Sequence, residues 1–267
     1  MFLDILTSFR RMLVPTCPLY ENRCTFPPGE CVYFPKGPKL RSKFFKKTVA
    51  LLKRLPIDLG QYEVRYTTKG KQILFSLLPD GHGKTGLDLG CRDGYWSRKL
   101  SARGYKVVSV DLEPLDPSVI RLDANERFPF PDESFDLVWC TEVIEHVKDP
   151  SFTLGEIHRL LRPDGLFLMT TPNSDFWLFR VFRLFGVTPA ELQNEDHRQF
   201  FSFADMPKLM DACELFGYFP YVLFKKTITK DASLLSPTIV VRWQPPRVSQ
   251  SEPAPALSHP VSVSTLS

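Results

Sequence analysis

Apolar and polar residues alternate in regular blocks along the middle of the chain, and the blocks switch between two periods. Short apolar runs bounded by glycine, proline or charged residues predict strands near 85–89, 106–111, 119–122, 135–140 and 166–171. Segments with apolar residues three or four positions apart predict helices near 67–78, 94–103 and 151–161. Alternation of this kind indicates an α/β domain with a parallel sheet and helices on both faces.

Two parts of the pattern depart from this alternation. Only residues 112–118, with two prolines, join the second and third strands, so we expect a loop or one turn in place of the usual crossover helix. After Asp196 the pattern predicts a helix near 203–216, followed by strands near 219–227 and 237–243.

Both ends of the chain differ from this central region. We divide the chain into a helical and loop extension at 1–60, a domain at 61–244 and a disordered tail at 245–267, which is rich in proline and serine. Within the extension the spacing predicts amphipathic helices over 2–13 and 40–55, and the second of these is strongly basic. Such a helix either packs on the core with its lysines in solvent or contacts an anionic membrane face or substrate.

Composition changes this picture little. The 267 residues are 43% hydrophobic with a net charge of +4, which suits a globular protein and requires neither nucleic acid nor a membrane as partner. No apolar run reaches the ~18–20 residues of a membrane span, and Asp4 stands where a signal peptide carries positive charge. We therefore expect a cytoplasmic protein, peripheral to membranes at most. Cys17, Cys24 and Cys31 indicate either free thiols in a loop or three ligands of a structural zinc.

A glycine-punctuated turn follows the strand near 85–89 and carries the first chemical signal. Gly90 and Gly94 allow the backbone to approach a ligand at the carboxyl edge of a sheet, and Asp111, which closes the next strand, can accept hydrogen bonds from a ribose diol. A dinucleotide fingerprint reads G-x-G-x-x-G, whereas here Asp88 precedes the glycines in the order D-x-G-x-R-x-G. An acid at that position suits a cationic ligand without phosphate.

Together with Leu122-Asp123-Ala124 and the segment from Phe135 to Val147, this region resembles the class I S-adenosylmethionine-dependent methyltransferases over roughly residues 65 to 225. The resemblance implies a Rossmann-like, seven-stranded, mostly parallel sheet with an antiparallel last strand. It also implies S-adenosylmethionine as the cofactor, with Gly90 and Gly94 beneath the methionine part and Asp88 supporting that turn or binding the amino group. The remaining cofactor contacts are expected from Asp111, Leu112, Asp123, Ala124 and Thr141.

Arg92 is a departure, because the family usually has glycine at this middle position of the turn. Its side chain is expected either to point away from the ligand or to cover it, which would weaken or reshape cofactor binding. The alternative is a non-catalytic partner protein in which Arg92 closes the pocket.

Acidic and imidazole side chains directly follow the fourth strand, at Glu142, Glu145 and His146. A similar Glu-x-x-Glu-His occurs in ubiquinone-type O-methyltransferases and in small-RNA 3′-terminal 2′-O-methyltransferases, where an Asp-His pair completes a magnesium site. Asp196-His197 stands in the corresponding stretch, so a magnesium ion on Glu142, Glu145, His146 and His197 is one reading, with zinc as a second. Without a metal, Glu142 and Glu145 shape the turn or position the substrate, and His146 or His197 is the candidate base.

An aromatic segment at 175–186 lies where this family inserts its substrate-covering element, and it carries Arg180 and Arg183. It either contacts a quinone, aromatic or lipid-linked acceptor or packs on the chain's own helices. The leading hypothesis is therefore an O-methyltransferase acting on a small or lipid-linked metabolite. RNA 2′-O-methylation is the alternative, although no aromatic RNA-stacking module accompanies the basic 36–54 segment. The sequence indicates no oligomeric state.

Overall fold

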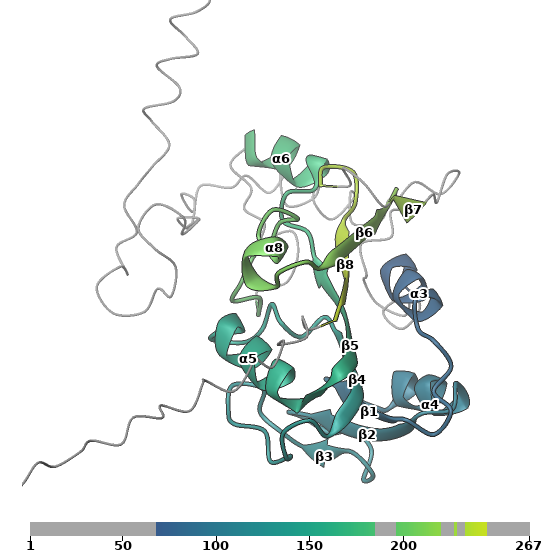
Figure 1. The fold of residues 1–267 in the computed structure, drawn as a ribbon. Helices are drawn as coiled ribbons and strands as arrows, with labels where there is room; N and C mark the ends of the chain where they lie inside the picture. The colour runs from purple at the N-terminus through teal and green to yellow at the C-terminus, as the bar shows by residue number, and fades with distance from the viewer. Residues whose placement is uncertain (1–67, 185–195, 220–226, 229–232, 245–267) are drawn as a thin grey trace, which may run out of the picture.

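The computed structural model describes residues 68–184, 196–219, 227–228 and 233–244 (Figure 1). The predicted helices over 2–13 and 40–55, the three N-terminal cysteines and the tail at 245–267 lie outside the described residues. Among the described helices, none has the length and apolar character to cross a bilayer.

A single twisted sheet forms the centre of the protein. Its strands are β1 Thr85–Leu89, β2 Lys106–Asp111, β3 Ile120–Arg121, β4 Phe135–Thr141, β5 Leu161–Pro172, β6 Glu214–Tyr218, β7 Thr227–Ile228 and β8 Thr238–Trp243. They are ordered β3-β2-β1-β4-β5-β8-β6-β7, and β8 runs antiparallel to both of its neighbours. The expected Rossmann-like sheet with an antiparallel last strand is confirmed, and the two-residue β7 adds an eighth strand at its edge.

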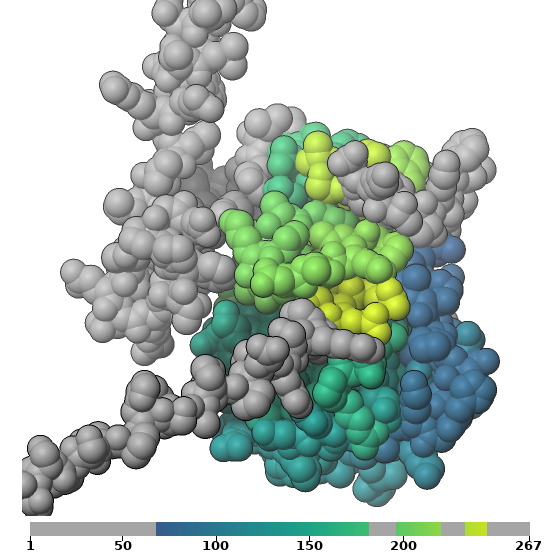
Figure 2. All heavy atoms as spheres, in the orientation of Figure 1, coloured from purple at the N-terminus to yellow at the C-terminus, as the bar shows by residue number. Residues whose placement is uncertain are grey.

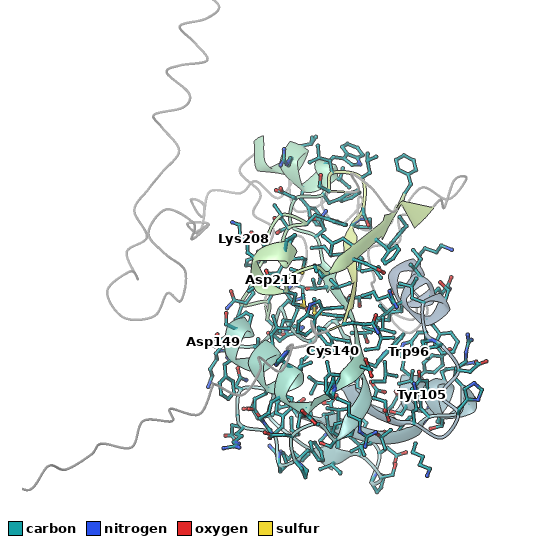
Figure 3. All side chains as sticks on the ribbon, viewed as in Figure 1. Trp96, Tyr105, Cys140, Asp149, Lys208 and Asp211 are labelled. Carbon is teal, nitrogen blue, oxygen red and sulfur yellow. The ribbon has the colours of Figure 1, made fainter. Side chains whose placement is uncertain are left out.

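Helices cover both faces of the sheet, as the alternation predicted. On one face α3 (Lys69–Ser76) and α4 (Tyr95–Ala102) enclose an apolar cluster that includes Leu74, Leu100 and Trp139. Trp96 of α4, which is labelled in Figure 3, packs against Trp139 of β4 with 5.1 Å between the ring centroids. The opposite face is covered by α5 (Pro150–Leu160) and α8 (Met206–Leu209) over a larger cluster. The helix α6 (Trp177–Leu184) lies beyond the carboxyl end of β5.

Two of these helices, α5 and α3, begin at residues whose side chains favour a helix start. Asp149 caps α5, where its side chain accepts hydrogen bonds from the amides of Ser151 and Phe152, and Pro150 occupies the first turn. Thr68 caps α3 by accepting a bond from the amide of Lys71. The crossover at 112–118 forms no helix, which confirms that prediction.

The segment after residue 203 was predicted wrongly. The expected helix over 203–216 shrinks to the single turn of α8, and β6 begins at Glu214, inside the range predicted as helix. Most of the strand expected near 219–227 lies outside the described residues. Ala212 adopts a left-handed conformation (φ 55°), which turns the chain back toward the sheet. Leu215 and Phe216 then pair with Val241 and Val240 of β8. Backbone hydrogen bonds to a distant strand outweigh the local helical period here.

Candidate functional site

Two glycines with positive φ shape the turn after β1. Gly90 has a φ of 79°, and a Cβ atom at this position would lie 2.2 Å from Cγ2 of Val143. The amides of Gly90 and Cys91 donate to the carbonyl of Val110 at 2.9 and 3.1 Å, which ties the turn to β2. Gly94, with φ 70°, precedes α4. The turn therefore offers backbone, not side chains, at the carboxyl edge of β1.

Asp111 organises this turn through both of its carboxylate oxygens. The Arg92 amide donates to Oδ2 at 2.7 Å and the Glu113 amide donates to Oδ1 at 2.8 Å. Each oxygen keeps acceptor capacity for a hydroxyl group, as a ribose diol requires. Arg92 itself adopts φ 54° and its side chain is exposed. Its exposure is compatible with both expected orientations, away from the ligand or across it.

Asp88 lies beneath the turn and is almost completely buried. Its Oδ2 accepts a hydrogen bond of 2.6 Å from the Ser97 hydroxyl, and the Ser109 hydroxyl in turn donates to Ser97 at 2.8 Å. Burial raises the pKa of Asp88 to about 7, while the Ser97 hydrogen bond acts in the opposite direction. Asp88 thus joins the end of β1 to the first turn of α4, which agrees with the expected supporting role.

The expected adenine side of the site is formed by the loop after β3. Oδ1 of Asp123 accepts from the backbone amide and side-chain amide of Asn125, which lowers the pKa of Asp123. Ala124 is buried, and its carbonyl accepts from the Thr153 hydroxyl at 2.9 Å. Leu112, directly after Asp111, is 48% exposed. An apolar side chain left in solvent beside the Asp111 carboxylate offers a surface for a flat, apolar group.

Lys71 lies beside the candidate site and was missed by motif reasoning. It lies on the buried face of α3 with only 6% exposure, and its positive charge opposes the burial that raises the pKa of both Asp88 and Glu145. The first turn of α3 lies close to β8, because a Cβ atom on Gly70 would be 3.0 Å from Thr238. A lysine on the apolar face of the predicted helix over 67–78 was the available signal, since lysines are rarely buried without a partner charge.

On the other side of β1, two carboxylates follow β4. Thr141 is buried at the end of the strand, and Glu142 adopts φ 58°, with its Oε1 accepting from the Thr170 hydroxyl at 2.8 Å. Glu145 is 1% exposed, and its Oε2 accepts from Thr171 at 3.1 Å, whereas its Oε1 is buried without a partner. Burial, followed by the charge of Glu142, raises the pKa of Glu145 well above its usual value.

His197 joins this group from a distant part of the chain. The amides of Arg198 and Gln199 donate to the backbone carbonyl of Glu145 at 2.9 and 3.0 Å. The rings of His146 and His197 consequently meet edge to face with 4.8 Å between centroids. Burial, followed by the charge of His146, lowers the pKa of His197 to about 4, so its imidazole is neutral at physiological pH.

One ligand atom from each of Glu145, His146 and His197 lies within 4.8 Å of the others. This spacing can hold a divalent ion. Glu142, the fourth expected ligand, is bound to Thr170 and is not a member of that group. The structure thus brings together three of the four residues expected at a metal.

Comparisons with known proteins agree with this geometry. A family model described as a methyltransferase domain matches residues 61–215. The ubiquinone biosynthesis O-methyltransferase of Aromatoleum aromaticum is 32% identical over 123 residues, covering 41% of this chain and 51% of the relative. The enzyme of the same name from Pseudomonas paraeruginosa is 33% identical over 115 residues, covering 37% and 50%. The chain thus matches these curated relatives over about half of their length.

Among solved structures, an S-adenosylmethionine-dependent methyltransferase of Thermotoga maritima matches with a TM-score of 0.53 at 18% identity. The match covers 74% of this chain and 96% of that one. At this identity the likeness concerns the fold.

Proposed function

Since the chain belongs to the class I S-adenosylmethionine-dependent methyltransferases, we propose that it methylates a hydroxyl oxygen of a small or lipid-linked metabolite. The observation that carries this proposal is the grouping of His197 with Glu145 and His146, whose ligand atoms lie within 4.8 Å of one another. A neutral imidazole can accept the hydroxyl proton as the oxygen forms its bond to the methyl carbon.

The residues around the glycine turn fit the cofactor. S-adenosylmethionine supplies a methyl group activated by a cationic sulfur. Asp111 is proposed to bind the ribose, while Leu112, Asp123 and Ala124 border the adenine and Thr141 contacts the cofactor from the β4 side. Gly90 brings backbone without a Cβ atom to the carboxyl edge of β1, because Val143 fills the space that a Cβ atom would need. Lys71, which is buried on α3, is proposed to meet the carboxylate of the methionine part.

In the proposed reaction each residue of the acceptor side has a separate task. His197 would take the proton from the acceptor hydroxyl, and S-adenosylmethionine would supply the methyl group to the oxygen. The His146 ring packs edge to face against the ring of His197 and holds it in place. Nδ1 of His146 lies 3.3 Å from the Asp196 carbonyl oxygen. Glu142 is fixed by Thr170 and shapes the turn that leads to Glu145.

A divalent ion is an alternative way to activate the same hydroxyl. Glu145, His146 and His197 would hold it, and the unpartnered Oε1 of Glu145 supports this fit. The ion would lower the pKa of a bound acceptor oxygen. One carboxylate with two imidazoles is a donor set for zinc or iron(II) more than for magnesium, which prefers oxygen ligands. Loss of activity in a chelator, with recovery on one added ion, would favour this route over the base route.

The nature of the acceptor rests on less direct support. Phe176 and Phe179 of the aromatic segment are buried, at 1% and 4% exposure, so these two rings pack within the protein. Arg180 pairs with Asp175 at 3.0 Å. The metabolite assignment therefore draws on the curated relatives, whose name gives an O-methyltransferase of ubiquinone biosynthesis.

The test is incubation of the full chain with isotopically labelled S-adenosylmethionine and separate metabolite, lipid and RNA pools. We expect a labelled, alkali-stable methyl ether in the metabolite or lipid pool, and its loss in the His197→Ala variant. Label confined to RNA would replace the proposal with the RNA alternative. Absence of transfer to any pool, despite measured cofactor binding, would contradict the proposed activity.

A further inference from the structure

Two consecutive threonines near the end of β5 hold the two carboxylates that follow β4. The Thr170 hydroxyl donates to Oε1 of Glu142 at 2.8 Å, and the Thr171 hydroxyl donates to Oε2 of Glu145 at 3.1 Å. Side chains of neighbouring residues in a strand point to opposite faces of the sheet. The two threonines therefore hold Glu142 and Glu145 on opposite sides of β5.

The packing of β5 identifies which carboxylate lies on which side. Leu168 belongs to the apolar cluster beneath α3 and α4, whereas Met169 belongs to the cluster beneath α5 and α8. Continued alternation places Thr170, and with it Glu142, on the side of α3 and α4. Glu145 lies on the other side, grouped with the two histidines. The two carboxylates that the sequence places in one motif are thus separated by the sheet.

The order of the strands places Glu142 at one end of the cofactor site. Asp111, the proposed ribose ligand, ends β2, the glycine turn follows β1, and Glu142 follows β4. These strands are neighbours in the order β2-β1-β4. Val143, the residue after Glu142, fills the space next to Gly90. A cofactor that begins at Asp111 and crosses the glycine turn therefore reaches the end of β4 with its methionine part.

The methionine part carries an ammonium group, and Asp88 is poorly placed to bind it. Asp88 lies beneath the turn with 2% exposure and accepts a hydrogen bond from Ser97. Glu142 is only partly buried, and the Thr170 hydroxyl uses one of the roughly four acceptor positions of its carboxylate. Glu142 can therefore accept further hydrogen bonds from a cationic ligand.

The backbone of Glu142 gives an independent reason to look for a ligand. Its φ of 58° lies in the left-handed region, where residues with a side chain are uncommon. Its amide donates to the Thr170 carbonyl at 2.9 Å, so this conformation is fixed by β5. Glycine would form the same turn without strain, and strained residues gather where a side chain contacts a ligand.

Lys71 lies on the same side of the sheet as Glu142. It is buried on α3, and the first turn of that helix packs on β8, because a Cβ atom on Gly70 would lie 3.0 Å from Thr238. Figure 2 shows the residues of α3, in blue, beside those of β8, in yellow. A cation from α3 and an anion after β4 form the charge pattern that the zwitterion of an amino acid requires.

We propose that Glu142 binds the ammonium group of the methionine part of S-adenosylmethionine, while Lys71 meets the carboxylate. The Glu-x-x-Glu-His motif then serves two purposes, because Glu142 contacts the cofactor, whereas Glu145 and His146 belong to the acceptor side. Glu142 is thereby a cofactor ligand and not the fourth ligand of an ion. This assignment does not depend on which acceptor is methylated.

The test is calorimetric titration of the full chain with four ligands in the presence of a chelator. S-adenosylmethionine and S-adenosylhomocysteine carry both the ammonium group and the carboxylate, decarboxylated S-adenosylmethionine carries the ammonium group alone, and 5′-methylthioadenosine carries neither. Glu142→Gln should weaken binding of the first three ligands by about 10- to 100-fold, because a hydrogen bond between charged groups is lost. Its affinity for 5′-methylthioadenosine should stay within about twofold of the wild type.

Two further variants separate the charges. Lys71→Met should weaken both ligands that carry the carboxylate and leave decarboxylated S-adenosylmethionine unchanged. Glu133→Gln removes an exposed carboxylate from the opposite end of β4 and should leave all four affinities unchanged. It is the matched control for the loss of one negative charge.

Equal binding of S-adenosylhomocysteine by the wild type and Glu142→Gln would overturn the proposal. A loss confined to the two sulfonium ligands would also overturn it, because Glu142 would then face the sulfur. A loss for all four ligands would assign Glu142 to the folding of the turn, and a loss that appears only with an added divalent ion would assign it to that ion. The titrations contain no acceptor, so a failed methyl-transfer assay would leave their result unaffected.

Discussion

The two halves of the candidate site are built in different ways. The cofactor half lies where β1 and β2 end, and there the Gly90 amide donates to the Val110 carbonyl and the Arg92 amide donates to Asp111. The acceptor half joins Glu145 and His146 to a histidine about fifty residues further along the chain. A local turn needs only its own residues, whereas the acceptor half exists only when β4, β5 and the segment after 196 have packed together. Substitutions in the cofactor half should therefore weaken cofactor binding, whereas substitutions in the acceptor half should slow the chemical step.

The largest expected effect is on the chemical step, in His197→Ala. If His197 is the base, kcat should fall by about 10²–10⁴-fold while cofactor affinity stays within about twofold. Because the pKa of His197 is lowered to about 4, wild-type activity should rise near pH 4 and then show no further dependence on this group through neutrality. The measurements are steady-state rates across pH and calorimetry, with the exposed His82→Ala as control. A parallel loss of cofactor binding would mean that the halves are not separate.

Next in size is Asp111→Ala in the cofactor half. Losing two hydrogen bonds to a charged carboxylate should weaken S-adenosylmethionine binding by about 100-fold. Asp116→Ala, in the same loop, removes a carboxylate that caps only Ser118 and should change the affinity little. Calorimetric titration of both variants decides the matter. Equal affinities for the two variants would remove Asp111 from the site.

Lys71→Met tests whether the two halves of the site are separate, because the charge of this lysine acts on Asp88 in the cofactor half and on Glu145 in the acceptor half. If Lys71 binds the cofactor carboxylate, affinity for S-adenosylmethionine should fall by about 10-fold, while affinity for 5′-methylthioadenosine, which lacks that carboxylate, should not change. Lys99→Met on the exposed side of α4 controls for the loss of a positive charge. An equal loss for both ligands would show a structural role instead.

Asp88 gives a stability test within the cofactor half. Its folded pKa of about 7 lies above the ordinary value of 3.8, so the native state holds a proton that the unfolded state releases between pH 4 and 7. The free energy of unfolding of the wild type should therefore fall, relative to Asp88→Asn, as pH rises through that range, by at most about 4 kcal/mol. Denaturant unfolding at several pH values measures this difference. A constant difference would show that the carboxyl is ionised throughout.

Arg92→Gly should have the smallest effect. The exposed arginine contributes its backbone amide to Asp111, and glycine retains that amide at a positive φ. We expect cofactor affinity to change by less than about threefold, measured by calorimetry. A much larger gain in affinity would show that the arginine side chain obstructs the cofactor after all.

Sequence patterns predicted the sheet well wherever a strand was short, apolar and bounded by turns. β1 and β2 agree with the predicted ranges, and the predicted glycine turn and Asp111 lie at the same carboxyl edge. The prediction for the segment after 203 failed because apolar residues there fit both a helical and an extended spacing. Pairing of Leu215 with Val241 of β8 favours the strand over the helix. Lys71 was missed because a lysine in a helix reads as solvent-exposed until packing buries it.

By itself the sequence determined the cofactor turn, since glycines at positive φ and an acid after the next strand act through bonds between near neighbours. It also placed Glu142, Glu145 and His146 directly after β4. Only the tertiary structure decided that His197 meets His146, that Glu142 turns to Thr170, and that Lys71 is buried toward the site. These arrangements depend on contacts between segments far apart in the chain. Local sequence patterns do not predict which distant side chains will contact one another in the folded protein.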